Sequence, residues 1–107
     1  MTDSEFMQHA EDALADIEDA VDASGLDIEL SRAGNVLTLE FADGARVVVN
    51  SQAPMKQLWV AARSGAHHYE WRDGWRDTRD GTELFAALSR IVSALGGSAI
   101  VISSRRR

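Results

Sequence analysis

The spacing of hydrophobic residues changes along the chain and first predicts a helix. Between about Asp3 and Ser24, apolar residues recur at helical spacing and fall within an arc of roughly 80°. This apolar stripe consists of Phe6, Ala10, Ala13, Leu14, Ile17 and Val21. The opposite arc holds Glu11, Asp12, Asp16, Glu18, Asp19 and Asp22. Gly25 is expected to end this helix because glycine readily adopts the left-handed conformation of a C-cap.

The middle of the chain alternates between apolar and polar residues, which is the pattern of half-buried strands. Six such segments cover residues 27–32, 36–41, 46–50, 57–61, 67–71 and 75–78. Asp43-Gly44 is a strong signal for a type I′ hairpin turn. Pro54 interrupts the pattern because it cannot donate to a strand ladder.

A second helical pattern follows Asp80-Gly81-Thr82-Glu83, which matches a capping box with Asp80 as the N-cap. Its apolar stripe is Leu84, Phe85, Leu88, Ile91, Val92 and Leu95. Gly96-Gly97 is expected to close this helix. The tail, residues 98–107, contains a short apolar run expected to pack on the domain, and its end, Arg105–Arg107, is expected to fray.

These elements predict a single domain over residues 1–107 with the order α-β-β-β-β-β-β-α. Because each helix has one apolar stripe, both should cover the same face of an antiparallel sheet of about six strands. The fold class is therefore a two-layer α+β sandwich with one open sheet face. The residues expected to point toward the helices are Leu37, Leu39, Phe41, Val47, Val49, Leu58, Val60, Tyr69 and Trp71.

Strand alternation sends a second set of residues to the open face: Val48, Asn50, Gln57, Trp59, His68 and Glu70. A large aromatic residue among amides, such as Trp59, suits an anchor on a binding surface. The alternative is a local cluster in which Pro54 or Met55 shields the ring. His67 and His68 should point to opposite faces, so they are not expected to bind one metal ion together.

Composition adds a strong charge asymmetry. The first 31 of the 107 residues carry ten acids and no Lys or Arg, whereas the other 76 carry seven acids and eleven bases. The net charge of −6 therefore combines about −10 at the amino end with about +4 elsewhere. Such a distribution bears on partners and association rates rather than on the fold.

The absence of cysteine excludes disulfides, thiolate-bound zinc and a cysteine nucleophile. No apolar run approaches the roughly 20 residues that cross a bilayer. The amino end has neither a basic region followed by an apolar one nor the composition of a transit peptide. We therefore expect a cytoplasmic protein that does not associate with membranes.

The carboxylates of the first helix allow three interpretations. Glu11, Glu18 and Asp22 form a stripe on the exposed side, and Asp27 and Glu29 share the outward phase of the first strand. They could serve solubility, dock a basic protein or bind a hard cation such as Mg, Ca, Mn or iron through oxygen ligands. Because water competes with exposed carboxylates for the metal ion, we expect a modest metal affinity, with a Kd of ~1–100 μM.

The run VNSQAPMKQLWVA, followed by SGAHHYEWRDGWRDTRDGTELFAAL, resembles the frataxin family in its bacterial branch. The family pattern is met in register by Asn50, Gln52, Pro54, Gln57, Trp59 and Ala61. The likeness covers about residues 3–95. It implies a two-layer sandwich that binds ferrous and ferric iron weakly and docks on the cysteine desulfurase and the scaffold protein of iron–sulfur cluster assembly.

Carried over by residue, the resemblance assigns two sets. The acidic ridge, a metal-binding and docking surface, consists of Glu11, Glu18, Asp19, Asp22, Asp27 and Glu29. The sheet surface, a partner-binding patch, consists of Asn50, Gln52, Gln57 and Trp59. The resemblance implies a non-enzymatic regulator or supplier of iron, and we expect it to be a monomer without metal.

The alternative function uses Trp59 as the anchor of a binding module for single-stranded nucleic acid or for another protein. The acidic amino end opposes nucleic acid because it would repel phosphates. No nucleophile elbow, P-loop or dinucleotide-binding turn appears, and no paired Glu-x-x-His helices build a di-iron cage. No catalytic residue is therefore assigned.

Overall fold

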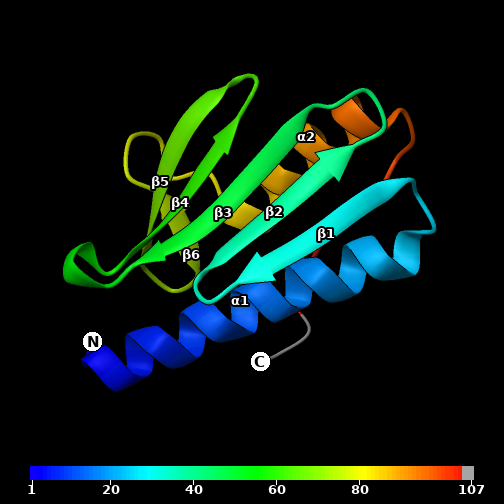
Figure 1. The fold of residues 1–107 in the computed structure, drawn as a ribbon. Coiled ribbons are helices and arrows are strands. Elements are labelled where there is room, and N and C mark those ends of the chain that lie inside the picture. The colour runs from blue at the N-terminus through cyan, green and yellow to red at the C-terminus, as the bar shows by residue number, and fades with distance from the viewer. Residues whose placement is uncertain (105–107) are drawn as a thin grey trace.

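The computed structural model describes residues 1–104 and contains one six-stranded sheet and two α-helices (Figure 1). The elements are α1 (Asp3–Ser24), β1 (Ile28–Ala33), β2 (Val36–Phe41), β3 (Arg46–Gln52), the 3-10 turn η1 (Ala53–Met55), β4 (Gln57–Ala62), β5 (Gly65–Trp71), β6 (Trp75–Asp77) and α2 (Leu84–Gly96). Each strand pairs antiparallel with the next, in the order β1 to β6. This confirms the predicted order of elements. Within the described range, neither helix is long and apolar enough to cross a membrane.

Helix α1 has the predicted bounds and the predicted buried stripe. Its N-cap is Thr2, whose hydroxyl accepts a hydrogen bond from the Glu5 backbone N–H at 3.1 Å, while the Glu5 carboxylate accepts one from the Thr2 N–H at 2.8 Å. At the other end Gly25 adopts a left-handed conformation with φ of 71°. All six apolar residues of the predicted stripe are buried.

The sheet buries one face, as predicted. A single core joins the inward residues of β2 to β5 with the apolar stripes of both helices. The fully buried sheet residues are Leu37, Leu39, Val47, Val49, Leu58, Val60, Tyr69 and Trp75. Both helices therefore lie against the same face, and the other face of the sheet is left without a covering layer.

One turn and the start of one helix differ from the prediction. Asp43-Gly44 does not form a type I′ turn, since only Gly44 has a positive φ there, 87°, and the Asp43 carboxylate accepts a hydrogen bond from the Ala45 N–H at 2.9 Å. Helix α2 does not begin at Asp80. Its N-cap is Glu83, because Gly81 is left-handed and Glu83 is still bridged to Arg76 of β6.

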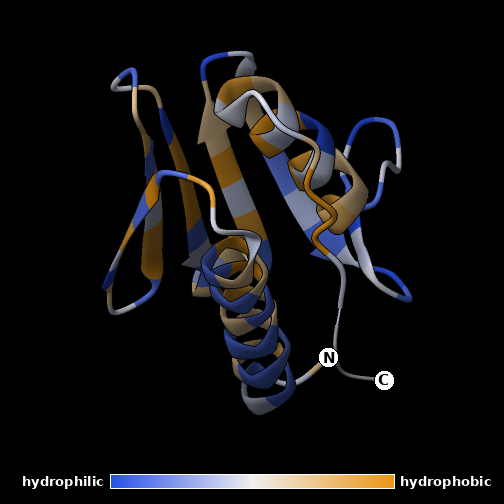
Figure 2. Cartoon of the chain, turned by 90° about the vertical axis from the view of Figure 1, so that its right-hand side faces the viewer, coloured by the Kyte–Doolittle hydropathy of each residue, from blue (hydrophilic) through white to orange (hydrophobic). Residues whose placement is uncertain are grey.

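The tail after α2 packs on the domain, as predicted. Ile100 and Ile102 are buried in the core. The Ser93 hydroxyl accepts from the Ile100 N–H at 2.9 Å, and the Ser89 hydroxyl accepts from the Ile102 N–H at 2.9 Å. Two serines one turn apart thus hold the backbone of the apolar segment that runs back along α2 in Figure 2. Arg105–Arg107 lie outside the described residues.

Candidate functional site

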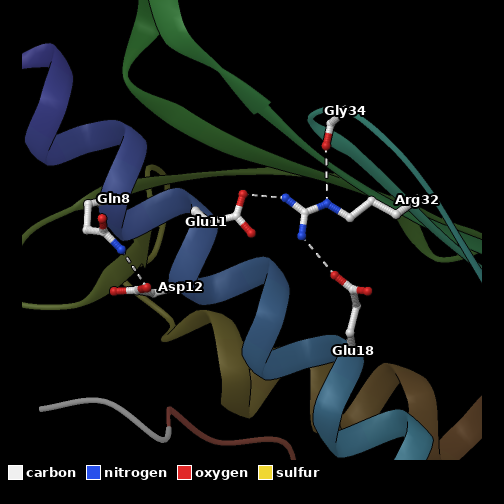
Figure 3. Close-up of polar contacts among 6 residues, drawn as sticks. All are labelled: Gln8, Glu11, Asp12, Glu18, Arg32 and Gly34. Carbon is white, nitrogen blue, oxygen red and sulfur yellow. Dashed lines mark hydrogen bonds and ion pairs between the residues drawn. The ribbon is translucent and has the colours of Figure 1, made fainter.

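Two carboxylates of the acidic ridge meet an arginine from β1 (Figure 3). Arg32 donates to Glu11 at 2.6 Å and to Glu18 at 2.9 Å, and its Nε donates to the Gly34 carbonyl at 3.1 Å. The register pairs Arg32 with Leu37, so its side chain points to the helix-bearing side of β1. The first basic residue of the chain therefore folds back onto α1.

The contacts of Arg32 with Glu11 and Glu18, called the Arg32 clamp below, reduce the negative charge of the ridge. The hydrogen bonds of this clamp, the strongest of them to Glu11, raise the pKa of Arg32 above its ordinary value. The ridge is thus partly neutralised by the protein itself at Glu11 and Glu18. By contrast, Asp22, Asp27 and Glu29 are exposed and have no ion pair within residues 1–104.

The carboxylates of the ridge lie on two sides of β1. Glu29 pairs directly with Glu40 of β2, on the open face, whereas Ile28 and Leu30 point to the helices. A cavity of about 260 Å³ at this corner is lined by Asp27, Glu29, Glu40, Phe41, Ala42 and Gly44. Glu29 thus has the outward phase predicted for it, and the pleat places its side chain on the face of β1 opposite α1. Glu40 was missed, although its outward phase in β2 was readable.

Asp16 was expected on the exposed arc of α1, and this expectation is wrong. Its exposed fraction is 1%, and it lines a cavity of about 160 Å³ with Trp75, Phe85 and Ser104. Strand β6 and the returning tail approach α1 at this position, so its polar arc is narrower than the sequence implies. At the same cavity, Trp71 stacks on His9 with a centroid distance of 3.8 Å. Although Trp71 points toward the helices as predicted, it stays 36% exposed at the sheet margin.

The donor chemistry of the ridge suits hard cations, because every side chain offers carboxylate oxygen. However, no three His, Asp or Glu side chains within residues 1–104 gather closely enough to hold a metal ion. A cation at the ridge would therefore use one or two carboxylates and keep most of its water ligands. Such a site is open and weak rather than a preformed cage.

The sheet surface is a block of four cross-strand neighbours on the open face. Asn50 lies opposite Trp59, and Gln52 lies opposite Gln57. The Gln52 side-chain amide donates to the side-chain oxygen (Oδ1) of Asn50 at 2.8 Å, and the Trp59 indole N–H donates to the side-chain oxygen of Gln57 at 2.8 Å. These two hydrogen bonds fix the orientation of the amides and the indole before any partner arrives.

The Trp59 ring rests on His68 of β5, at a centroid distance of 4.2 Å with the planes 8° apart. The ring is half-buried, and its stacking contact comes from His68 rather than from Pro54 or Met55, which the alternative interpretation had named. His67, on the opposite face, places its Nδ1 3.2 Å from the Asp77 carboxylate. The two histidines thus point apart, as predicted.

An acidic helix packed beside an antiparallel sheet, whose open face carries oriented amides and one indole, defines a small two-layer α+β domain. The chain matches the Frataxin-like domain family over residues 1–98 and belongs to this family. A relative from Paraburkholderia phymatum, named iron-sulfur cluster assembly protein CyaY, is 49% identical over 104 residues, covering 96% of this chain and 99% of the relative. A relative of the same name from Janthinobacterium is 53% identical over 108 residues, covering 95% and 96%.

Solved structures agree with this assignment. Frataxin from Psychromonas ingrahamii superposes with a TM-score of 0.90 at 33% identity, covering 96% of this chain and 99% of that one. Trimeric frataxin from Saccharomyces cerevisiae, in complex with ferrous iron, superposes with a TM-score of 0.74 at 26% identity, covering 84% and 87%.

Proposed function

We propose that this protein acts in iron–sulfur cluster assembly as a non-enzymatic, iron-binding regulator or supplier of iron. The observation that carries the proposal is the set of exposed ridge carboxylates without an ion pair in the described chain, in a member of the frataxin family. Relatives that bear the name of this process cover almost the whole chain.

Iron in this proposal is cargo held weakly at the acidic ridge. Asp22, Asp27 and Glu29 supply the first contacts, with Asp19 beside them, and Glu11 and Glu18 contribute when Arg32 moves away. Asp22 lies in the last turn of α1, which holds no basic residue, so a cation there also offsets an unfavourable interaction with the helix dipole. Ferrous and ferric ions are both hard enough for these oxygen ligands.

The protein partners in this proposal are a cysteine desulfurase and the scaffold protein of the pathway. A basic surface on the desulfurase would meet the acidic ridge, whose field speeds encounter. Asn50, Gln52, Gln57 and Trp59 would form a second contact on the open sheet face. Nothing favours nucleic acid as the ligand, because one face of the Trp59 ring is already covered by His68 and the amino end is acidic.

Anaerobic isothermal titration with ferrous iron tests the metal part of the proposal. The double variant Asp22→Asn/Asp27→Asn should weaken binding about tenfold, since it removes two anionic oxygen ligands. The matched control is Asp3→Asn/Asp73→Asn, which removes the same charge from the first turn of α1 and from the turn between β5 and β6, both remote from Asp22 and Asp27. Equal affinities for the two double variants would contradict iron binding at the ridge.

A further inference from the structure

A second polar cavity lies on the helix-bearing side of the sheet, where β5, β6 and α2 meet. The Tyr69 cavity, of about 140 Å³, is lined by Ser64, His67, Tyr69, Asp77, Asp80 and Arg90 among others. None of these residues belongs to the acidic ridge or the sheet surface, so the cavity plays no part in the proposed iron chemistry.

The hydroxyl of Tyr69 is the unusual group in this cavity. Tyr69 is only 1% exposed, and within residues 1–104 its hydroxyl makes no hydrogen bond. Yet no fully buried side-chain oxygen in the described chain is left unsatisfied. The little surface that Tyr69 retains is therefore at its hydroxyl, which opens into the cavity. A nearly buried phenol without a protein partner leaves a position for a ligand atom.

The charged side chains around the Tyr69 hydroxyl determine which charge a bound ligand can carry. The carboxylates of Asp77 and Asp80 line the cavity against a single guanidinium, that of Arg90. Burial first, and then Asp77 and Asp80, raise the pKa of Tyr69 to about 12, while Arg90 acts in the opposite direction. The potential at the hydroxyl is therefore negative, which favours a cation and disfavours a carboxylate or a phosphate.

Existing hydrogen bonds hold the two carboxylates in place. Asp77 accepts from the Arg79 N–H at 2.7 Å and contacts His67 at 3.2 Å, and Asp80 accepts from the Thr82 N–H at 2.9 Å. These side chains and His67 do not gather closely enough for a metal ion, within the part of the chain that the structure describes. An organic cation with its own N–H donors suits the cavity better.

An apolar groove adjoins the cavity and shares Ser64, Arg90 and Ile91 with it. This α2 groove, of about 400 Å³, is lined mainly by apolar atoms, from residues that include Ala62, Ala94 and Leu95. It gives an alkyl stem somewhere to lie when its charged end enters the Tyr69 cavity.

We propose that the Tyr69 cavity binds a primary alkylammonium group, donating to the Tyr69 hydroxyl oxygen and the Asp80 carboxylate, with its alkyl stem in the α2 groove. A free alkylamine and a lysine side chain of a peptide share this chemistry. Arg90 lines both the Tyr69 cavity and the α2 groove. Its positive charge repels the ammonium group and so lowers the affinity.

Titration of ¹⁵N-labelled protein with hexylammonium, followed by amide chemical shifts, tests this proposal. We expect saturable shifts confined to residues 62–69, 77–82 and 87–95, weaker binding of methylammonium, and no binding of hexanoate. Acetylated, amidated lysine separates the two sources: tighter binding than hexylammonium assigns the site to a peptide side chain, and weaker binding assigns it to a free amine. Non-saturable shifts, or equal binding of hexanoate, would overturn the proposal.

Three variants should change the affinity for hexylammonium in opposite directions. Tyr69→Phe and Asp80→Asn should each weaken hexylammonium binding about tenfold, whereas Arg90→Gln should tighten it severalfold. The matched controls are Asp73→Asn and Arg46→Gln, which each remove one charge from a residue that lines neither the Tyr69 cavity nor the α2 groove; both should leave the affinity unchanged. Weaker binding by Arg90→Gln contradicts the assignment. The same variants should bind ferrous iron as tightly as the wild type does. The proposal for the Tyr69 cavity and the proposal for the acidic ridge are therefore tested independently.

Discussion

Arg32→Gln should move stability and cation affinity in opposite directions. The substitution removes the guanidinium that bridges Glu11 and Glu18 at 2.6 and 2.9 Å. Glu11 is 57% exposed and Glu18 is 32% exposed, so solvent screens both pairs and each contributes only about 0.5 kcal/mol. Unfolding should therefore cost about 1 kcal/mol less, a decrease in Tm of about 4 °C for a domain of this size.

The same change takes the guanidinium away from Glu11 and Glu18 and removes one positive charge from the ridge. At a few ångströms and an effective dielectric constant between protein surface and water, that charge opposes a bound cation by about 1–2 kcal/mol. Ferrous iron should therefore bind about tenfold more tightly to Arg32→Gln under anaerobic titration.

The control is Arg46→Gln, whose arginine contacts Glu40 at 3.6 Å and is itself 63% exposed. It should change the Tm little and the iron affinity less than Arg32→Gln. Unchanged or weaker iron binding by Arg32→Gln would refute the view that Arg32 and iron compete for the same carboxylates.

Four further outcomes are expected. Ile102→Ala should lower the free energy of unfolding by about 2–4 kcal/mol in urea denaturation, because the side chain is buried in the core; exposed Val101→Ala is its control, and equal effects would contradict tail packing. Asp22→Asn should raise the Tm of the metal-free protein, since it removes an acid from the carboxyl end of α1; a lower Tm would count against this. Tyr69, the only tyrosine, should ionise near pH 12 in ultraviolet titration. Because the pKa of Tyr69 is raised from 10 in the folded state, stability is full below pH 10 and falls as the pH rises toward 12. Ionisation of Tyr69 near pH 10 in the folded protein would show that burial and the neighbouring carboxylates do not raise its pKa. Trp59→Ala should weaken binding to the scaffold protein while changing the Tm less than Leu58→Ala, and unchanged binding would remove Trp59 from the interface.

Most helices and strands could be predicted from the sequence, because apolar residues recur at a different spacing in a helix than in a strand. The helix over 3–24 and the six strands follow from spacings of 3.6 and 2, and so does the opposite orientation of His67 and His68. The start of α2 was not readable, because a capping box at Asp80 competes with a bridge between Arg76 and Glu83 that forms only in the folded sheet.

The sequence shows which residue types form the candidate site, but it does not predict how their side chains are arranged. Acid-rich residues on α1 stand out in the sequence, yet the clamp of Arg32 on Glu11 and Glu18 joins residues 14 and 21 positions apart, which only the packing of β1 beside α1 brings together. The burial of Asp16 likewise depends on the tail and β6. That Trp59 shares a face with His68 follows from alternation, whereas their direct stacking depends on the register of β4 and β5.

The function of the acidic ridge is tested most sharply by the variant Glu18→Lys/Asp19→Lys/Asp22→Lys, which reverses its charge. Its binding to a cysteine desulfurase is measured by isothermal titration after circular dichroism has confirmed the fold. Docking through the acidic ridge requires that the variant loses desulfurase binding, that it binds ferrous iron more weakly, and that wild-type binding weakens as salt is raised. Unchanged affinity of this variant for both ligands would contradict it.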